Sequence, residues 1–242
     1  MRAQIQPDKL IRQCAVALVA ALCGSSPAPT AAAVGTSISL TSDDWFRGRS
    51  LSNGRPVAGL DLSYDDSSGI YLGGTATGVA TAHSGLRLLG SQQNIGYATR
   101  TKADPVLDVG IVNSIFTRYF SGRRAAHYTE AYFGVVTRHL SSHVYYSPRY
   151  LQRGISTLYG ELDGVIEISP TWRLNGHFGV LRQLGDTPPP PRSHYDWRAG
   201  ITTQFRNFEF QLAVVGGGSS PNFYARQSQN SSAVVVGISR IF

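Results

Sequence analysis

From about residue 36 to its end, the chain alternates apolar and polar residues over segments of about eight to twelve residues. Helical periodicity is almost absent. Gly, Pro, Asn, Asp and Ser interrupt the segments, which is typical of strands joined by turns. The pattern predicts about twelve strands, over residues 36–47, 56–64, 70–78, 86–100, 106–120, 127–138, 142–148, 156–168, 172–184, 195–205, 208–215 and 233–242.

Several of these segments present one apolar and one polar face. In 56–64, for example, Leu60 and Leu62 alternate with Asp61 and Ser63. Successive side chains of a strand point to opposite faces of the sheet, so each strand has an apolar and a polar wall. A soluble sandwich with an apolar interior and a membrane barrel with an apolar exterior both fit this periodicity.

The lengths of the connections distinguish the two architectures. Short connections (65–69, 101–105, 139–141, 169–171 and 206–207) alternate with longer ones (48–55, 79–85, 121–126, 148–155, 185–194 and 216–232). Tight periplasmic turns and long outer loops are the layout of outer-membrane barrels. We therefore predict an all-β fold, a transmembrane antiparallel up-and-down β-barrel of about twelve strands with both termini in the periplasm.

Aromatic residues cluster near the predicted strand ends, which agrees with this fold. Amphipathic rings at the two membrane–water boundaries form the girdles expected of such barrels. The residues concerned are Trp45, Phe46, Tyr119, Phe120, Tyr145, Tyr146, Trp172, Tyr195, Trp197, Phe205 and Phe208.

The N-terminus reads as a secretory signal. Arg2, Lys9 and Arg12 precede a short apolar run over 14–22, and Ala31 and Ala33 form an A-x-A cleavage site. We expect residues 1–33 to be a signal peptide cleaved near Ala33, and 34–242 to form one outer-membrane barrel domain. The mature chain then has no cysteine and a net charge of about +5, with scattered basic residues. That distribution predicts no nucleic-acid partner.

The last predicted strand carries its own signal. Val234, Val236, Ile238 and the terminal Phe242 share one face, and Arg240 interrupts that face near the expected membrane edge, where it can snorkel. An alternating strand that ends in an aromatic residue resembles the terminal signal by which barrel-assembly machinery recognises outer-membrane proteins.

The mature chain resembles the TorF-type, Gcw-type family of proteobacterial porins. Its start, Thr41-Ser-Asp-Asp-Trp-Phe-Arg-Gly-Arg-Ser50, is similar to the family's T-S-D-x-x-F-R-G-x-S pattern. The fifth strand departs from the family's tyrosine-rich form and reads Asn113-Ser-Ile-Phe-Thr-Arg-Tyr119. The resemblance implies a porin-like outer-membrane barrel. Further similar pieces are 69–73, 130–134, 145–150, 172–179 and 239–242.

The polar faces, gathered in a barrel, would form a lumen of mixed charge. A short turn at 169–171 predicts two cross-strand pairs, Glu167 with Arg173 and Asp163 with His177. The residues predicted to line the lumen are Asp61, Asp108, Glu130, Arg138, Glu161, Asp163, Glu167, Arg173, His177, Asp196, Arg198 and Glu209.

This lumen predicts a porin-like channel for passive diffusion of small polar solutes or ions. One alternative is a barrel filled by side chains, since twelve strands lie between the filled eight-stranded barrel and the open sixteen-stranded porin. Such a barrel would anchor partners or stiffen the membrane. Another alternative is a membrane-embedded hydrolase, but the sequence has no G-x-S-x-G motif, so we predict no enzyme, no catalytic residue and no cofactor.

Histidines and paired aspartates do not predict a metal site. The six histidines lie singly on different segments, with no zinc-type spacing apart from His139 and His143. Turn chemistry explains Asp43-Asp44 and Asp65-Asp66 better than a calcium loop does.

Arginines gather in the predicted outer loops, and lysine is nearly absent from the mature chain. Guanidinium groups suit phosphate, which points to lipopolysaccharide as a partner. Ordinary solvated loops are the alternative interpretation. The residues are Arg47, Arg49, Arg55, Arg123, Arg124, Arg149, Arg153, Arg192 and Arg226, and a polyproline stretch at 188–191 is expected to act as a rigid spacer.

Overall fold

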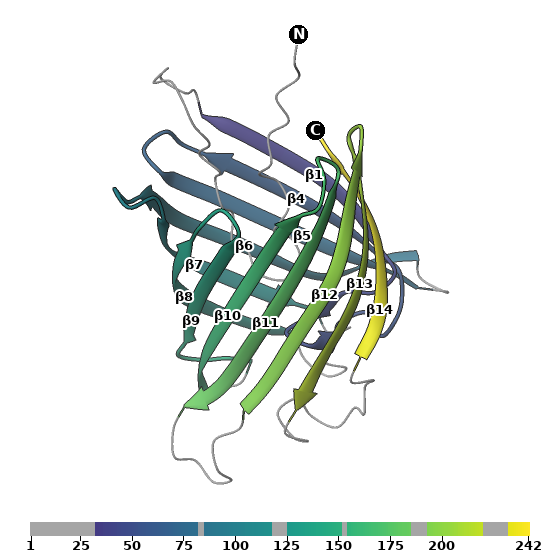
Figure 1. The fold of residues 1–242 in the computed structure, drawn as a ribbon. Coiled ribbons are helices and arrows are strands. Elements are labelled where there is room, and N and C mark those ends of the chain that lie inside the picture. The colour runs from purple at the N-terminus through teal and green to yellow at the C-terminus, as the bar shows by residue number, and fades with distance from the viewer. Residues whose placement is uncertain (1–31, 82–84, 118–124, 152–153, 185–192, 220–231) are drawn as a thin grey trace.

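A computed structural model describes residues 32–81, 85–117, 125–151, 154–184, 193–219 and 232–242. Twelve antiparallel strands form a closed barrel, as predicted (Figure 1). The strands are β1 (Ala33–Thr41), β4 (Val57–Asp65), β5 (Ile70–Thr81), β6 (Gly85–Arg100), β7 (Val106–Phe116), β8 (Ala126–Val136), β9 (Leu140–Ser147), β10 (Ser156–Glu167), β11 (Trp172–Leu184), β12 (Ser193–Phe205), β13 (Phe208–Ser219) and β14 (Ser232–Ile241).

Pairing of the first and last strands closes the barrel. Residues Ser37 to Thr41 of β1 lie opposite Ile241 to Gly237 of β14, and β1 also pairs with β4. Every other barrel strand pairs with its neighbours in sequence. In the described barrel sheet, closure leaves no open edge, and an even number of strands brings both ends of the barrel chain to one side (Figure 1).

The outer wall of the barrel is apolar. On β4, Leu60, Leu62 and Tyr64 are exposed, whereas Ser63 is buried. On β13, Phe210, Leu212 and other residues of the same face are exposed as well. A soluble barrel would bury this face, so the direction of the apolar wall matches a membrane barrel. Within the described part of the chain, no helix is long and apolar enough to cross a membrane.

The connections alternate in length with one exception. The turns on the side of the termini are short, at 66–69, 101–105, 137–139, 168–171 and 206–207. On the opposite side, the loop predicted over 79–85 was wrong in length. β5 continues to Thr81, opposite Gly85, after a β-bulge at Thr77 and Gly78, which leaves three residues between the strands.

The largest departure from the predicted strands lies between β1 and β4. The strand predicted over 36–47 ends at Thr41, and residues beyond it form two short strands, β2 (Trp45–Phe46) and β3 (Arg49–Ser50). Trp45 is buried against the interior faces of β13 and β14. The sequence predicted Trp45, Phe46 and Tyr145 in an aromatic girdle. That prediction was wrong, because all three pack in the interior of the barrel.

Some predictions lie outside the described residues. These are the signal peptide up to residue 31, the polyproline stretch, Tyr119, Phe120, His83 and the loop residues Arg123, Arg124, Arg153, Arg192 and Arg226.

Candidate functional site

A hairpin inside the barrel is the first part of the site. We call residues 43–52 the inner hairpin. Trp45 pairs with Ser50 and Phe46 with Arg49, and the two residues between them, Arg47 and Gly48, have φ of 47° and 72°. Positive φ at both central positions is the geometry of a type I′ turn, which suits a two-residue hairpin. Glycine fits this conformation readily, whereas Arg47 adopts it at some cost.

Asp43 holds the base of the inner hairpin together. Its carboxylate accepts hydrogen bonds from Trp45 Nε1 (2.6 Å), Ser50 Oγ (2.6 Å) and Ser52 Oγ (2.5 Å), and from the Gly54 amide (3.1 Å). Burial and the neighbouring Asp43 carboxylate raise the pKa of the partly buried Asp44 to about 7. The inner hairpin is therefore held together by hydrogen bonds to one carboxylate, that of Asp43.

The tip of the inner hairpin is fixed by Arg47. Its guanidinium donates two hydrogen bonds to Glu130 of β8, at 2.9 and 2.8 Å, and lies 4.0 Å from the ring centre of Tyr159 on β10. Its carbonyl accepts a hydrogen bond of 2.6 Å from His194 of β12. Arg47 is 4% exposed and Glu130 is 2% exposed. The arginine that the sequence assigned to an outer loop and to lipopolysaccharide is thus buried inside the barrel.

Gly48 allows the hairpin to approach the opposite wall. A Cβ at this position would lie 2.8 Å from the Asp196 Cβ and 3.0 Å from the Gly217 Cα on β13. Contacts of Arg47 and Gly48 with β8, β10, β12 and β13 mean that the tip spans the lumen.

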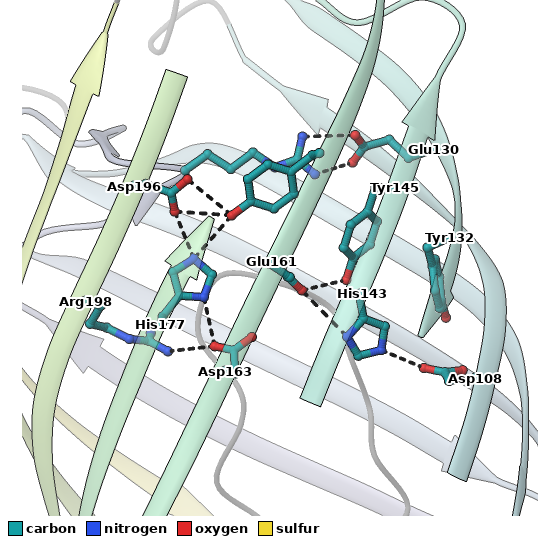
Figure 2. Close-up of polar contacts among 12 residues, drawn as sticks. Asp108, Glu130, Tyr132, His143, Tyr145, Glu161, Asp163, His177, Asp196 and Arg198 are labelled. Atoms are coloured by element: carbon teal, nitrogen blue, oxygen red, sulfur yellow. Dashed lines mark hydrogen bonds and ion pairs between the residues drawn. The ribbon is translucent and has the colours of Figure 1, made fainter. Parts of the chain in front are cut away.

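A first polar group in the interior is centred on Asp108 of β7. The Asp108 carboxylate accepts a 2.6 Å hydrogen bond from Tyr71. It also contacts His143 Nε2 of β9 at 3.2 Å (Figure 2). The Tyr71 hydroxyl also hydrogen bonds to Tyr132. Asp108 and His143 are almost completely buried, and the Asp108 carboxylate provides a polar partner for both Tyr71 and His143.

A second polar group joins β10, β11 and β12. His177 contacts Asp163 through Nδ1 at 2.8 Å and Asp196 through Nε2 at 2.9 Å (Figure 2). The Tyr159 hydroxyl donates to Asp196, and Arg198 lies 3.9 Å from Asp163. Asp163 stands opposite His177 and Glu167 opposite Arg173 in the register, which confirms both predicted pairings.

The remaining residues predicted to line the lumen lie nearer the end of the barrel at which the termini are found. Asp61 accepts a 2.8 Å hydrogen bond from Ser37, and Arg173 lies 3.6 Å from Glu209. Arg138 was predicted on a strand, but it lies in the turn between β8 and β9, 70% exposed and 3.8 Å from Glu167. The strand ends at Val136 because the chain reverses there, so Arg138 is at the rim of the barrel.

Sequence reasoning missed several interior residues. Tyr71, Tyr132, His143 and His194 are buried and hydrogen bonded, and only their alternation with outward residues could have indicated them. Tyr132, for instance, lies two residues after Glu130 and so on the same strand face. No signal in the sequence marked Arg47 as an interior residue.

The charge of the interior differs in sign from that of the chain. The chain has a formal net charge of +7. Apart from Arg138 and Glu167 at the rim, the predicted lumen set contains seven carboxylates and two arginines, and Arg47 adds a third, which leaves an excess of four negative charges. The interior is therefore acidic in a basic protein.

Residues 25–242 match the sequence profile of a family described as "Bacterial protein of unknown function (Gcw_chp)". The chain belongs to this family. The match agrees with the Gcw-type part of the resemblance, whereas the TorF assignment stays a prediction. No curated protein matches the chain.

Solved porins share the fold of this Gcw_chp member. The KdgM porin is 12% identical, with 86% of this chain and 99% of the porin covered and a TM-score of 0.51. The NanC porin is 9% identical, with 86% and 99% covered and a TM-score of 0.53. At such identity the likeness shows a common porin-type barrel fold.

Proposed function

We propose that the protein is an outer-membrane channel that the inner hairpin closes at rest and that passes small cations or small polar solutes when the hairpin undocks. The observation that carries the proposal is the docking of Arg47 on Glu130 inside a closed barrel with an apolar outer wall. Transport would be passive diffusion, without a catalytic step. In this proposal the termini face the periplasm and the hairpin end faces outward.

The acidic interior supports a preference for cations. Apart from Arg138 and Glu167 at the rim, the residues predicted to line the lumen include seven carboxylates, against three interior arginines when Arg47 is counted. Rings and walls of acidic side chains favour cations in a narrow pore. Some of these carboxylates are already paired, so the unpaired excess sets the preference.

The test is a planar-bilayer recording with two matched glycine variants. Gly48 and Gly54 both have positive φ, 72° and 70°. A Cβ would clash with the far wall at Gly48, whereas at Gly54 it would meet no described residue within 4 Å. We expect rare openings for the natural protein and for Gly54→Ala. Gly48→Ala should open at least about ten times as often, with cations carrying more of the current, because the clash disfavours docking by more than about 1.4 kcal/mol.

A second candidate is a permanently filled structural barrel, as the sequence also allowed. The burial of Arg47, Glu130, Asp108 and His143 favours it, since tightly paired groups fill much of the interior. The same recording separates the two functions. Absence of current from a folded Gly48→Ala protein would contradict the channel and leave the filled barrel.

We also propose lipopolysaccharide phosphate as a partner of the hairpin end. Arg55 and Arg149 are exposed there, next to β4 and β9. Guanidinium groups bind phosphate through paired hydrogen bonds. Replacing Arg149 by Gln should weaken lipopolysaccharide binding in detergent, whereas Arg206→Gln in the turn at the opposite end should leave it unchanged.

A further inference from the structure

We propose that the barrel holds one divalent transition-metal ion, with Glu161, Asp163 and His177 as its core ligands and His143 as the fourth. One ligand atom from each of the three core residues lies within 4.8 Å of the other two, and all three residues face the interior. His143 Nδ1 lies 3.9 Å from a Glu161 carboxylate oxygen. The sequence predicted no metal site.

The strand register builds this set. Glu161 and Asp163 are two residues apart on β10, so their side chains share its interior face. Glu161 stands opposite His143 on β9, and Asp163 stands opposite His177 on β11. The central strand thus supplies two carboxylates, and each flanking strand supplies one imidazole. Two imidazoles with two carboxylates are a donor set that Zn²⁺ and similar ions accept.

Each histidine is oriented as a metal ligand would be. Nε2 of His177 contacts Asp196 at 2.9 Å, and Nε2 of His143 contacts Asp108 at 3.2 Å (Figure 2). A ligating histidine typically donates its other ring N–H to a carboxylate in this way, which leaves the opposite nitrogen as the ligand atom. In both residues that opposite nitrogen is Nδ1, and both Nδ1 atoms face the carboxylates of β10.

Two buried atoms at the site have no hydrogen-bond partner among the residues that the structure describes. They are Glu161 Oε2 and His143 Nδ1, and both side chains are 0% exposed. The other Glu161 oxygen accepts a 2.9 Å hydrogen bond from Tyr145. A buried carboxylate oxygen and a buried imidazole nitrogen without partners are costly. A cation between them would satisfy both.

The local charge also calls for a cation. Asp108, Glu161, Asp163 and Asp196 form the polar groups around the site, and the guanidinium of Arg198 lies 3.9 Å from Asp163. Without an ion, His177 offsets part of this charge when both of its ring nitrogens are protonated between Asp163 and Asp196. Buried carboxylates whose charge is not fully offset are destabilising. A divalent ion would offset two negative charges and link three adjacent strands. The site does not depend on an open lumen, so it stands apart from the proposed channel function.

The test is a Zn²⁺ titration by calorimetry of the full-length protein, folded in detergent and first treated with chelator. We expect saturable binding of one ion per chain. Glu161→Gln and His177→Gln should each weaken binding at least about 100-fold, and Asp196→Asn about 10- to 100-fold. His127→Gln on the exposed face of β8 is the matched control and should leave the affinity unchanged.

Circular dichroism of each variant shows whether the barrel has folded. If the core variants do not fold, Co²⁺ added to the natural protein provides the second measurement, because tetrahedral Co²⁺ with nitrogen and oxygen ligands absorbs visible light strongly. No saturable binding in the natural protein, or unchanged affinity in folded Glu161→Gln, would overturn the site. Either result would leave the recordings of Gly48→Ala untouched.

Discussion

Arg47 is the residue on which docking of the inner hairpin depends. Removal of one member of a buried ion pair leaves an uncompensated charge, at a cost of about 3–5 kcal/mol, whereas replacement of both members is often close to neutral. We therefore expect Arg47→Met and Glu130→Gln to lower the free energy of unfolding by about 3–5 kcal/mol each. Both residues are nearly fully buried, so solvent screening is small.

A double-mutant cycle in urea measures this coupling. The Arg47→Met/Glu130→Gln protein should recover most of the stability lost in either single variant. Arg47→Lys serves as a control, because it keeps the charge but loses the paired hydrogen bonds and much of the stacking on Tyr159. Additive losses in the cycle would show that the pair does not fix the hairpin.

Asp44 gives the inner hairpin a pH dependence. Its pKa is raised from 3.8 to about 7 in the folded protein. Between these values the unfolded chain has released the proton and the folded chain retains it, so stability falls as pH rises from about 4 to about 7. Denaturant midpoints at pH 5 and pH 8 should show this fall, and it should shrink in Asp44→Asn. An unchanged slope in that variant would assign the effect to other groups.

At the scale of the strand, the two faces differ in what they tolerate. Ile111 is at the middle of β7, on the outer wall, and is 50% exposed. An arginine in the middle of a lipid-facing wall costs about 2–4 kcal/mol. We expect Ile111→Arg to lower the free energy of unfolding in lipid vesicles by this amount.

A matched change outside the membrane checks the interpretation. Ser68 lies in the exposed turn between β4 and β5, so Ser68→Arg should change stability by less than about 0.5 kcal/mol. Equal effects of the two substitutions would mean that the outer wall does not face lipid.

At the scale of the whole molecule, the terminal aromatic can be tested in assembly. Phe242 is 59% exposed, and the Arg240 guanidinium lies 4.8 Å from its ring centre. If Phe242 serves recognition by assembly machinery, Phe242→Ala should reduce the folded protein in the outer membrane of cells severalfold and leave refolding in detergent nearly unchanged. Phe205→Ala, another exposed aromatic, is the control. Equal losses in both variants would argue against a recognition role.

The barrel itself follows from local patterns. Alternation on β4 and β13, short turns such as Asn207 after Arg206, and the pairing of Glu167 with Arg173 could each be read from neighbouring residues. The strand ends were predicted less accurately, because β5 continues to pair with β6 as far as Thr81, where the composition indicated a loop. The prediction for Arg138 was wrong in the opposite sense, because the predicted strand extended to residue 138 and β8 ends at Val136.

Alternation along the chain determined strands with one apolar and one polar wall, because side chains change face at every residue, and the lengths of the connections added the closed barrel. Only the tertiary structure determined where the inner hairpin lies. Arg47 and Glu130 are 83 residues apart, and nothing local brings them together. The meeting of His143, Glu161, Asp163 and His177 likewise arises from the register of three strands. Contacts between distant residues depend on how the whole sheet closes, and that information is not carried by any single segment.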